Sequence, residues 1–162
     1  MQDLIQEAGL SVGAVYRYFK SKDEIINAIS QTVAGGLAAV LTEIAAEDDL
    51  TLVGSLSRVL DVIDEQVAPG GNFPLAIQVW SEATLDPAIA AIVRERYLEL
   101  RMPFLVIAKR AAARGEVAAG ADPEAVAATL FGFIPAYATQ RQLVGSPDKE
   151  TFLSGVRALL TR

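Results

Sequence analysis

Residues 4–23 read LIQEAGLSVGAVYRYFKSKD, and this stretch decides how the chain begins to fold. Apolar side chains share one face of a predicted helix over residues 1–8. Gly9 ends that helix, because glycine readily takes the left-handed conformation of a C-cap. Ser11 is a suitable N-cap for a second short helix through residue 19. Two short helices joined by a tight turn that contains glycine form a helix-turn-helix.

Further helices are predicted along the rest of the chain. Ser21 and Glu24 form a capping box for a long third helix, in which apolar residues recur at helical spacing as far as Ile44. A polar break at residues 47–49 and the turn at residues 69–71 bound the next helix. No strand pattern occurs, so the predicted fold is all-α.

Prolines give the sharpest boundaries in the second half of the chain. An N-cap residue before a proline starts a helix without loss of a hydrogen bond, because the first helical amide has no partner within the helix. Pro103 and Pro135 fall inside helical patterns, so each is expected to kink or interrupt its helix. The three predicted starts are Asp86-Pro87, Asp122-Pro123 and Ser146-Pro147.

Composition favours a packed helical protein in the cytoplasm. Of the 162 residues, 52% are hydrophobic and 21% are charged, which is too apolar for intrinsic disorder. Cysteine and histidine do not occur in the sequence, which excludes disulfides, thiolate metal sites, cysteine nucleophiles and imidazole bases. We see no carboxylate pair arranged for catalysis or metal binding, and we expect no cofactor. The chain does not open like a signal peptide, and its most apolar run, residues 126–138, is too short to cross a membrane.

The distribution of charge matters more than its sum. A net charge of −6 at first argues against a nucleic-acid partner. Between residues 11 and 22, however, the only charged residues are Arg17, Lys20 and Lys22, all of them basic. Three such charges also occur on ordinary solvated surfaces, and on charge alone that alternative stays open. A small basic face on an acidic body can still dock on phosphate.

The side chains of the second predicted helix suit the DNA major groove, which such a helix enters with its N-terminal residues against the base edges. The side chains of its first turn are small, so the backbone can approach the DNA closely. Its next turn carries hydrogen-bond donors that reach bases or phosphates. A lysine at the start of the following helix can hold a phosphate together with free backbone amides. In chain order these residues are Val12, Gly13, Ala14, Tyr16, Arg17, Tyr18 and Lys22.

This stretch resembles the signature of the TetR family of transcriptional regulators. The resemblance is carried by Ala8-Gly9-Leu10-Ser11, Gly13, Tyr16-Arg17-Tyr18-Phe19 and Ser21-Lys22-Asp23. It is specific over residues 4–24 and weaker beyond, where Trp80-Ser81-Glu82-Ala83 before Asp86-Pro87 is also similar to many members. The resemblance implies that Ser11 and the seven residues above bind DNA, with Leu4, Ala8, Val15 and Phe19 as packing residues. It also implies two partners, double-stranded operator DNA and a second copy of the chain.

The resemblance further implies a division of the chain. Family members begin with one more helix that packs behind the helix-turn-helix, and here nothing precedes Met1. We therefore expect residues 1–22 to be a partial helix-turn-helix DNA-binding domain that lacks its first helix. Residues 23–162 are expected to form a helical effector-binding and dimerisation domain.

An effector pocket between the central helices is likewise implied by the resemblance. Its candidate residues are aromatic or polar side chains of the central helices, and for each one an ordinary place in the core or on the surface is the alternative. The candidates are Gln78, Trp80, Tyr97, Arg101, Phe104 and Tyr137.

A dimer interface is predicted on the last two helices. Residues 126–138 are apolar around the whole circumference of a helix, so more than one side needs cover. A central buried helix would explain this pattern, but the resemblance implies a four-helix contact between two copies, which we favour. The candidate interface residues are Phe131, Ile134, Phe152, Val156, Leu159 and Leu160.

These observations predict a regulator rather than an enzyme. The expected activity is DNA-binding transcriptional control by a repressor that a small, largely apolar effector releases from its operator. One rival is a helical dimeric sensing or interaction protein that does not bind DNA. The other rival, a helical enzyme, has little support because the usual acid-base residue, histidine, is missing.

Overall fold

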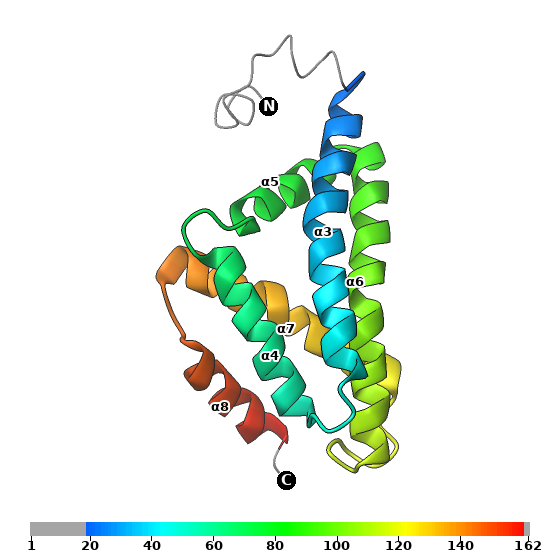
Figure 1. Ribbon diagram of the computed structural model, residues 1–162, viewed down its shortest axis with the longest axis vertical. Helices are drawn as coiled ribbons and strands as arrows, with labels where there is room; N and C mark the ends of the chain where they lie inside the picture. The colour runs from blue at the N-terminus through cyan, green and yellow to red at the C-terminus, as the bar shows by residue number, and fades with distance from the viewer. Residues whose placement is uncertain (1–18, 161–162) are drawn as a thin grey trace.

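The computed structural model describes residues 19–160, apart from the side chains of residues 22, 23 and 29–33. Within this range every regular element is an α-helix, which confirms the predicted all-α fold (Figure 1). The two helices predicted before residue 19 lie outside the described residues. The described helices are α3 (Lys22–Ala46), α4 (Leu52–Val67), α5 (Phe73–Ala83), α6 (Pro87–Ala113), α7 (Pro123–Val144) and α8 (Lys149–Leu160).

Two long helices form the spine of the molecule. Helices α3 and α6 lie side by side and run in the same direction, and they make the most extensive contact between any two described helices (Figure 1). Helix α4 runs back from the end of α3, and α5 leads from the end of α4 to the start of α6. Helix α7 packs against α6 and α4, and α8 packs against α4 on the side away from α3 (Figure 1).

Capping side chains start the helices where the sequence predicts them. The hydroxyl of Ser21 accepts a hydrogen bond from the Glu24 amide at 3.2 Å. The second hydrogen bond of the predicted capping box differs slightly. The Glu24 carboxylate accepts from the amide of Lys20 at 2.6 Å rather than from the amide of Ser21. The carboxylates of Asp86 and Asp122 cap α6 and α7, each with a proline at the first helical position. These local signals need no tertiary context, because cap and helix are adjacent in the chain.

The start of the last helix corrects one prediction. Helix α8 begins at Lys149, so Ser146-Pro147 precedes the helix instead of capping it. Asp148 takes that role, since its carboxylate accepts a hydrogen bond from the amide of Thr151 at 2.8 Å. That backbone hydrogen bond also holds the pKa of Asp148 below its ordinary value. Aspartate is among the best N-cap residues, which explains why the helix begins after it.

Neither internal proline interrupts its helix. Helix α6 is continuous through Pro103, and α7 is continuous through Pro135. Pro103 is itself buried, and the next residue, Phe104, is 1% exposed. Packing of this kind compensates the lost backbone hydrogen bond, which costs about 3 kcal/mol in an unsupported helix.

The core lies where α4 meets α3, α6 and α7. Val59 and Leu60 of α4 are fully buried there, together with apolar residues of the other helices. The turn between α4 and α5 is also tightly packed, because a Cβ atom at Gly71 would lie 2.1 Å from the carbonyl oxygen of Gln66. Only glycine fits at that position. No helix among the described residues is long and apolar enough to cross a membrane.

Candidate effector cavity and DNA-binding unit

The predicted DNA-binding residues fall at or beyond the edge of the described range. Lys22 is the first residue of α3, and its side chain is not described. The structure does show which body helix follows the helix-turn-helix, because α3 begins where the predicted unit ends. The remaining predicted DNA-binding residues lie outside the described residues; they are Ser11, Val12, Gly13, Ala14, Tyr16, Arg17 and Tyr18.

A cavity of about 150 Å³ lies among α3, α4, α5, α6 and α7. An apolar cavity of this size holds a molecule as large as benzene. Ala34 and Leu37 of α3 form part of its wall, so the helix that follows the helix-turn-helix borders the cavity directly. The other apolar lining residues are Ile63, Phe73, Leu75, Ala76, Val79, Trp80, Val93, Tyr97, Leu100, Phe131, Ile134 and Pro135.

Aromatic rings form two sides of this cavity. Phe73 and Trp80 of α5 meet edge to face, with ring centroids 5.9 Å apart. Tyr97 of α6 and Phe131 of α7 meet in the same way at 4.5 Å. Edge-to-face pairs are the favoured arrangement of aromatic rings, so both walls are well packed.

Three polar residues join the lining: Gln66, Asn72 and Arg96. Arg96 is the one charged residue among the described residues that line the cavity. Its Nη1 donates to the Glu99 carboxylate at 2.7 Å, while its Nε is buried and has no hydrogen-bond partner among the described residues. A buried donor without a partner costs about 1–3 kcal/mol. The cavity is therefore apolar with one incompletely satisfied cation in its wall.

The structure brings together two of the six predicted pocket residues. Trp80 and Tyr97 line the cavity. Phe104 is buried behind it and packs on Phe131, with ring centroids 5.5 Å apart. Arg101 pairs with Glu124 at 3.8 Å outside the cavity. The other two predicted residues lie elsewhere, Gln78 on the surface and Tyr137 in the core.

Sequence reasoning missed Arg96, although a signal for it was present. Val93 and Leu100 lie three residues before and four residues after Arg96, on one face of α6. Both line the cavity with it. An arginine on an otherwise apolar helix face is the pattern that could have identified this residue.

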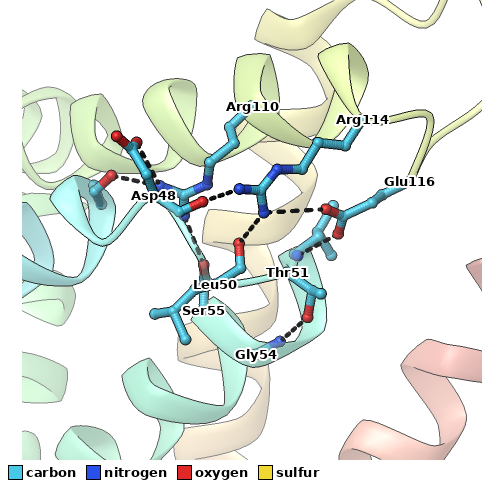
Figure 2. A network of polar contacts seen from close by, with 10 residues as sticks. Asp48, Leu50, Thr51, Gly54, Ser55, Arg110, Arg114 and Glu116 are labelled. Atoms are coloured by element: carbon cyan, nitrogen blue, oxygen red, sulfur yellow. Dashed lines mark hydrogen bonds and ion pairs between the residues drawn. The ribbon is translucent and has the colours of Figure 1, made fainter.

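At the C-terminal end of α3, a polar network joins the α3–α4 loop to the end of α6 (Figure 2). Arg110 donates to the carbonyl oxygen of Ala45 at 2.8 Å and to the hydroxyl of Ser55 at 3.0 Å. Arg114 donates to the carbonyl oxygens of Leu50, at 3.0 Å, and of Asp48. The C-terminal end of α3 and the loop that follows it are therefore both hydrogen-bonded to the end of α6.

Glu116 extends the same network to the start of α4 (Figure 2). Its carboxylate accepts from the amide of Leu52 at 2.5 Å and lies 3.9 Å from Arg114. The first amides of a helix lack partners within the helix, so this contact satisfies one of them. Thr51 satisfies another, since its hydroxyl accepts from the amide of Gly54 at 3.0 Å.

A second polar cluster holds α7 and α8 against α4. The Tyr137 hydroxyl donates to Asp64 at 2.8 Å, and Nε of Arg141 donates to the same carboxylate oxygen at 3.3 Å. Burial, followed by the hydrogen bond to Asp64, raises the pKa of Tyr137 well above its ordinary value. Lys149 at the start of α8 donates to Asp61 at 2.5 Å, which raises the lysine pKa.

The six predicted dimer residues divide between interior and surface. Phe131 and Ile134 are buried and line the cavity, and Val156 is 4% exposed. Phe152 is half-buried against Phe133 and Tyr137. Leu159 and Leu160, by contrast, are exposed. The outward side of α7 instead consists mostly of small side chains, namely Ala125, Ala128, Thr129, Gly132 and Ala136.

Comparison with known proteins identifies the class of protein. The family described as "Tetracyclin repressor-like, C-terminal domain" matches residues 46–148, and the family described as "Bacterial regulatory proteins, tetR family" matches residues 1–29. The structure of Salmonella enterica GusR is similar to this chain with a TM-score of 0.75 and 20% sequence identity, and the match covers 99% of this chain and 82% of that one. No curated protein sequence matches the chain.

The chain belongs to the TetR family of bacterial regulatory proteins. Members of this family are DNA-binding transcriptional regulators that act as dimers, and they are not enzymes. Family membership thus confirms the class predicted from residues 4–24. It also confirms the expectation that the protein is a regulator rather than an enzyme.

Proposed function

We propose that this protein is a homodimeric repressor that a small, largely apolar effector releases from operator DNA. The observation that carries the proposal is the place of the cavity. Its wall includes Ala34 and Leu37 of α3, the helix that begins at the end of the predicted helix-turn-helix. In this proposal residues 1–22 bind DNA and residues 23–162 bind the effector and the second subunit.

An effector in this cavity would act on α3 because the far end of α3 is fixed. Arg110 holds the carbonyl of Ala45, and Arg114 holds the loop that follows (Figure 2). A helix anchored at its C-terminal end responds to pressure on its middle by moving its N-terminal end. That movement would change the separation of the two recognition helices in a dimer, which must match successive major grooves.

Two glycines lower the helix propensity in the middle of α3. Gly35 and Gly36 follow Ala34 directly and precede Leu37, so they lie beside the cavity wall. Both are exposed, and a Cβ atom at either position would meet nothing within 4 Å. Each glycine within a helix costs about 1 kcal/mol relative to alanine. We infer that α3 bends at this pair when the cavity is filled.

Thermodynamic linkage sets what such an effector must do. It weakens DNA binding only to the extent that it prefers the conformation that does not bind DNA. Couplings of this kind are typically about 1–3 kcal/mol, which is about 5–150-fold in affinity. A ligand that occupies the cavity equally well in both conformations would leave repression unchanged.

The dimer contact belongs on the outward side of α7, with the exposed end of α8. Gly132 and Ala136 lie one turn apart there and leave room for a second helix to approach closely. Leu143 and Leu159 are 73% and 80% exposed, an arrangement that favours burial against another chain. The buried residues Phe131 and Ile134 would support this face from behind.

Binding to DNA from upstream of the protein's own gene tests the DNA-binding part of the proposal. A mobility-shift assay should show binding that weakens as salt rises, because each phosphate contact releases counterions. Arg17→Ala and Lys22→Ala should weaken binding and lower the salt slope by about one per lost contact. Lys109→Ala is the matched control, since Lys109 is an exposed cation on α6.

The same assay distinguishes the proposed repressor from a sensing or interaction protein that does not bind DNA. A sensing protein without DNA binding would show no shift even in dilute salt, and the proposal would then be wrong. Equal binding by Arg17→Ala, Lys22→Ala and Lys109→Ala would show that the basic residues of the helix-turn-helix do not carry the interaction. Salt-sensitive binding that the first two substitutions alone reduce supports the proposed function.

A further inference from the structure

Arg96 sets the chemistry of the cavity beyond its apolar character. Arginine keeps its charge at every physiological pH and carries five N–H donors with no acceptor. The Arg96 side chain is 22% exposed, and its Nε is buried without a partner among the described residues. A guanidinium beside an apolar cavity favours a ligand that brings an anionic acceptor, because charge-assisted hydrogen bonds are stronger where water is largely excluded.

The ion pair with Glu99 leaves other hydrogen-bond donors of the Arg96 guanidinium without an acceptor. The Glu99 carboxylate accepts from Nη1 alone, and the Glu99 side chain is 50% exposed. No described residue accepts a hydrogen bond from Nη2. A hydrogen bond between a guanidinium and a carboxylate is charge-assisted and is stronger than a neutral one.

The rest of the cavity sets the shape of the ligand. Trp80, Tyr97 and Phe131 offer aromatic surfaces, and the volume of about 150 Å³ admits one ring. The amides of Gln66 and Asn72 lie in the wall and could accept or donate to one further polar group. No acidic residue is among the described residues of the lining, so an anion meets no carboxylate in that wall.

We propose that the effector is a small aromatic carboxylate. Its carboxylate accepts a hydrogen bond from Nη2 of Arg96, and its ring lies among Trp80, Tyr97 and Phe131. This inference rests on the proposed function, because it takes the cavity as the effector site. It specifies the ligand class that the cavity selects, an anion in place of a neutral apolar compound.

Trp80 provides a direct measurement, because it is the sole tryptophan of the chain and lines the cavity. The full chain is titrated with benzoate, with its neutral analogue benzamide and with the cation benzylamine, and Trp80 fluorescence is followed. We expect a saturable change with benzoate and binding of the other two that is weaker by about tenfold or more. If the charge of Arg96 did not affect binding, the three compounds would not differ in affinity in this way.

Substitution of Arg96 identifies the group responsible. Arg96→Met should reduce the preference for benzoate over benzamide to about one, whereas Arg96→Lys should keep part of it because the charge remains. Arg94→Met is the matched control, since it removes an exposed arginine of the same helix that does not line the cavity. Binding of benzamide to Arg96→Met shows that this variant still forms the cavity.

Three outcomes would overturn the inference: equal affinity for benzoate and benzamide, unchanged benzoate affinity in Arg96→Met, or no response of Trp80 to any of the three compounds. The proposed function has a separate readout, which is DNA affinity. If benzoate binds selectively through Arg96 but leaves DNA affinity unchanged, the inference stands and the proposed effector role of the cavity falls. If neutral apolar compounds bind and release DNA while carboxylates do not, the reverse holds.

Discussion

Arg110 of α6 donates a hydrogen bond to the carbonyl oxygen of Ala45 in α3 across 2.8 Å. The other terminal nitrogen of Arg110 donates to the hydroxyl of Ser55, which is fully buried in α4. One side chain thus joins the last turn of α3, the first turns of α4 and the C-terminal half of α6. The proposed movement of α3 depends on this fixed point.

Removal of the Arg110 side chain beyond its apolar stem should destabilise the protein. Arg110→Met leaves the Ser55 hydroxyl and the Ala45 carbonyl without this donor, and hydrogen bonds to a charged group are worth about 1.5–3 kcal/mol. We expect a loss of about 2–3 kcal/mol in the free energy of unfolding, measured by urea denaturation. Lys109→Met, at the exposed neighbouring position, should change stability by less than about 0.5 kcal/mol. Equal stability of the two variants would contradict the anchoring role.

Replacement of the glycine pair of α3 by alanine should raise the stability of the protein but weaken the release of DNA by an effector. Gly35→Ala with Gly36→Ala should raise stability by about 1–2 kcal/mol, because alanine favours the helix and neither new methyl group meets a neighbour within 4 Å. Release of DNA by a bound effector should become weaker in the same variant. Gly155→Ala in α8 is the control, and it should gain stability without loss of release. Full release by the double variant would exclude a bend at this pair.

A charge on the outward side of α7 should prevent dimer formation. Ala136→Glu places a carboxylate on the proposed contact, where an unpaired buried charge costs several kcal/mol. Light scattering after gel filtration should show a monomer with an unchanged helical circular dichroism spectrum. Ala112→Glu, an exposed alanine of α6, is matched in size and charge and should remain dimeric. A dimeric Ala136→Glu variant would place the interface elsewhere.

Tyr137 should make the protein sensitive to alkali. Burial and the Asp64 hydrogen bond raise the pKa of its phenol in the folded state, so the folded protein holds this proton more tightly than the unfolded chain. The stabilisation is complete below about pH 10, the pKa of an unperturbed tyrosine, and declines as the pH rises beyond it.

Tyr137→Phe tests this dependence. At neutral pH it should lower stability by about 1 kcal/mol through the lost hydrogen bond. Between about pH 10 and 11.5 its stability should fall less steeply than that of the wild type. Tyr97→Phe serves as the control for the loss of a tyrosine hydroxyl, because no described residue is hydrogen-bonded to that group. Parallel pH profiles for the wild type and Tyr137→Phe would contradict this assignment.

The helix boundaries were predictable because their signals are local. Ser21, Asp86 and Asp122 each cap a helix through contacts within three residues of themselves. The sequence predicts the start of α8 too early because Ser146-Pro147 and Asp148 both offer N-cap signals within three residues. Only the backbone geometry shows which of them the helix uses.

The cavity was less predictable because it depends on contacts between distant parts of the chain. Tyr137 was proposed for the pocket, yet its hydroxyl binds Asp64, which lies 73 residues earlier. Phe131 and Ile134 were proposed for the dimer contact, yet they face the cavity. Helix α7 gives little directional signal, because its outward residues, such as Gly132 and Ala136, also count as apolar.

The linkage between cavity and DNA is the central claim, and one pair of titrations tests it. The affinity for labelled upstream duplex is measured by fluorescence anisotropy, with and without a compound that saturates the Trp80 signal. We predict that the compound weakens DNA binding by a factor in the range of about 5–150, and that saturating DNA weakens the compound's own binding by the same factor. Unchanged DNA affinity at full occupancy of the cavity would contradict the account.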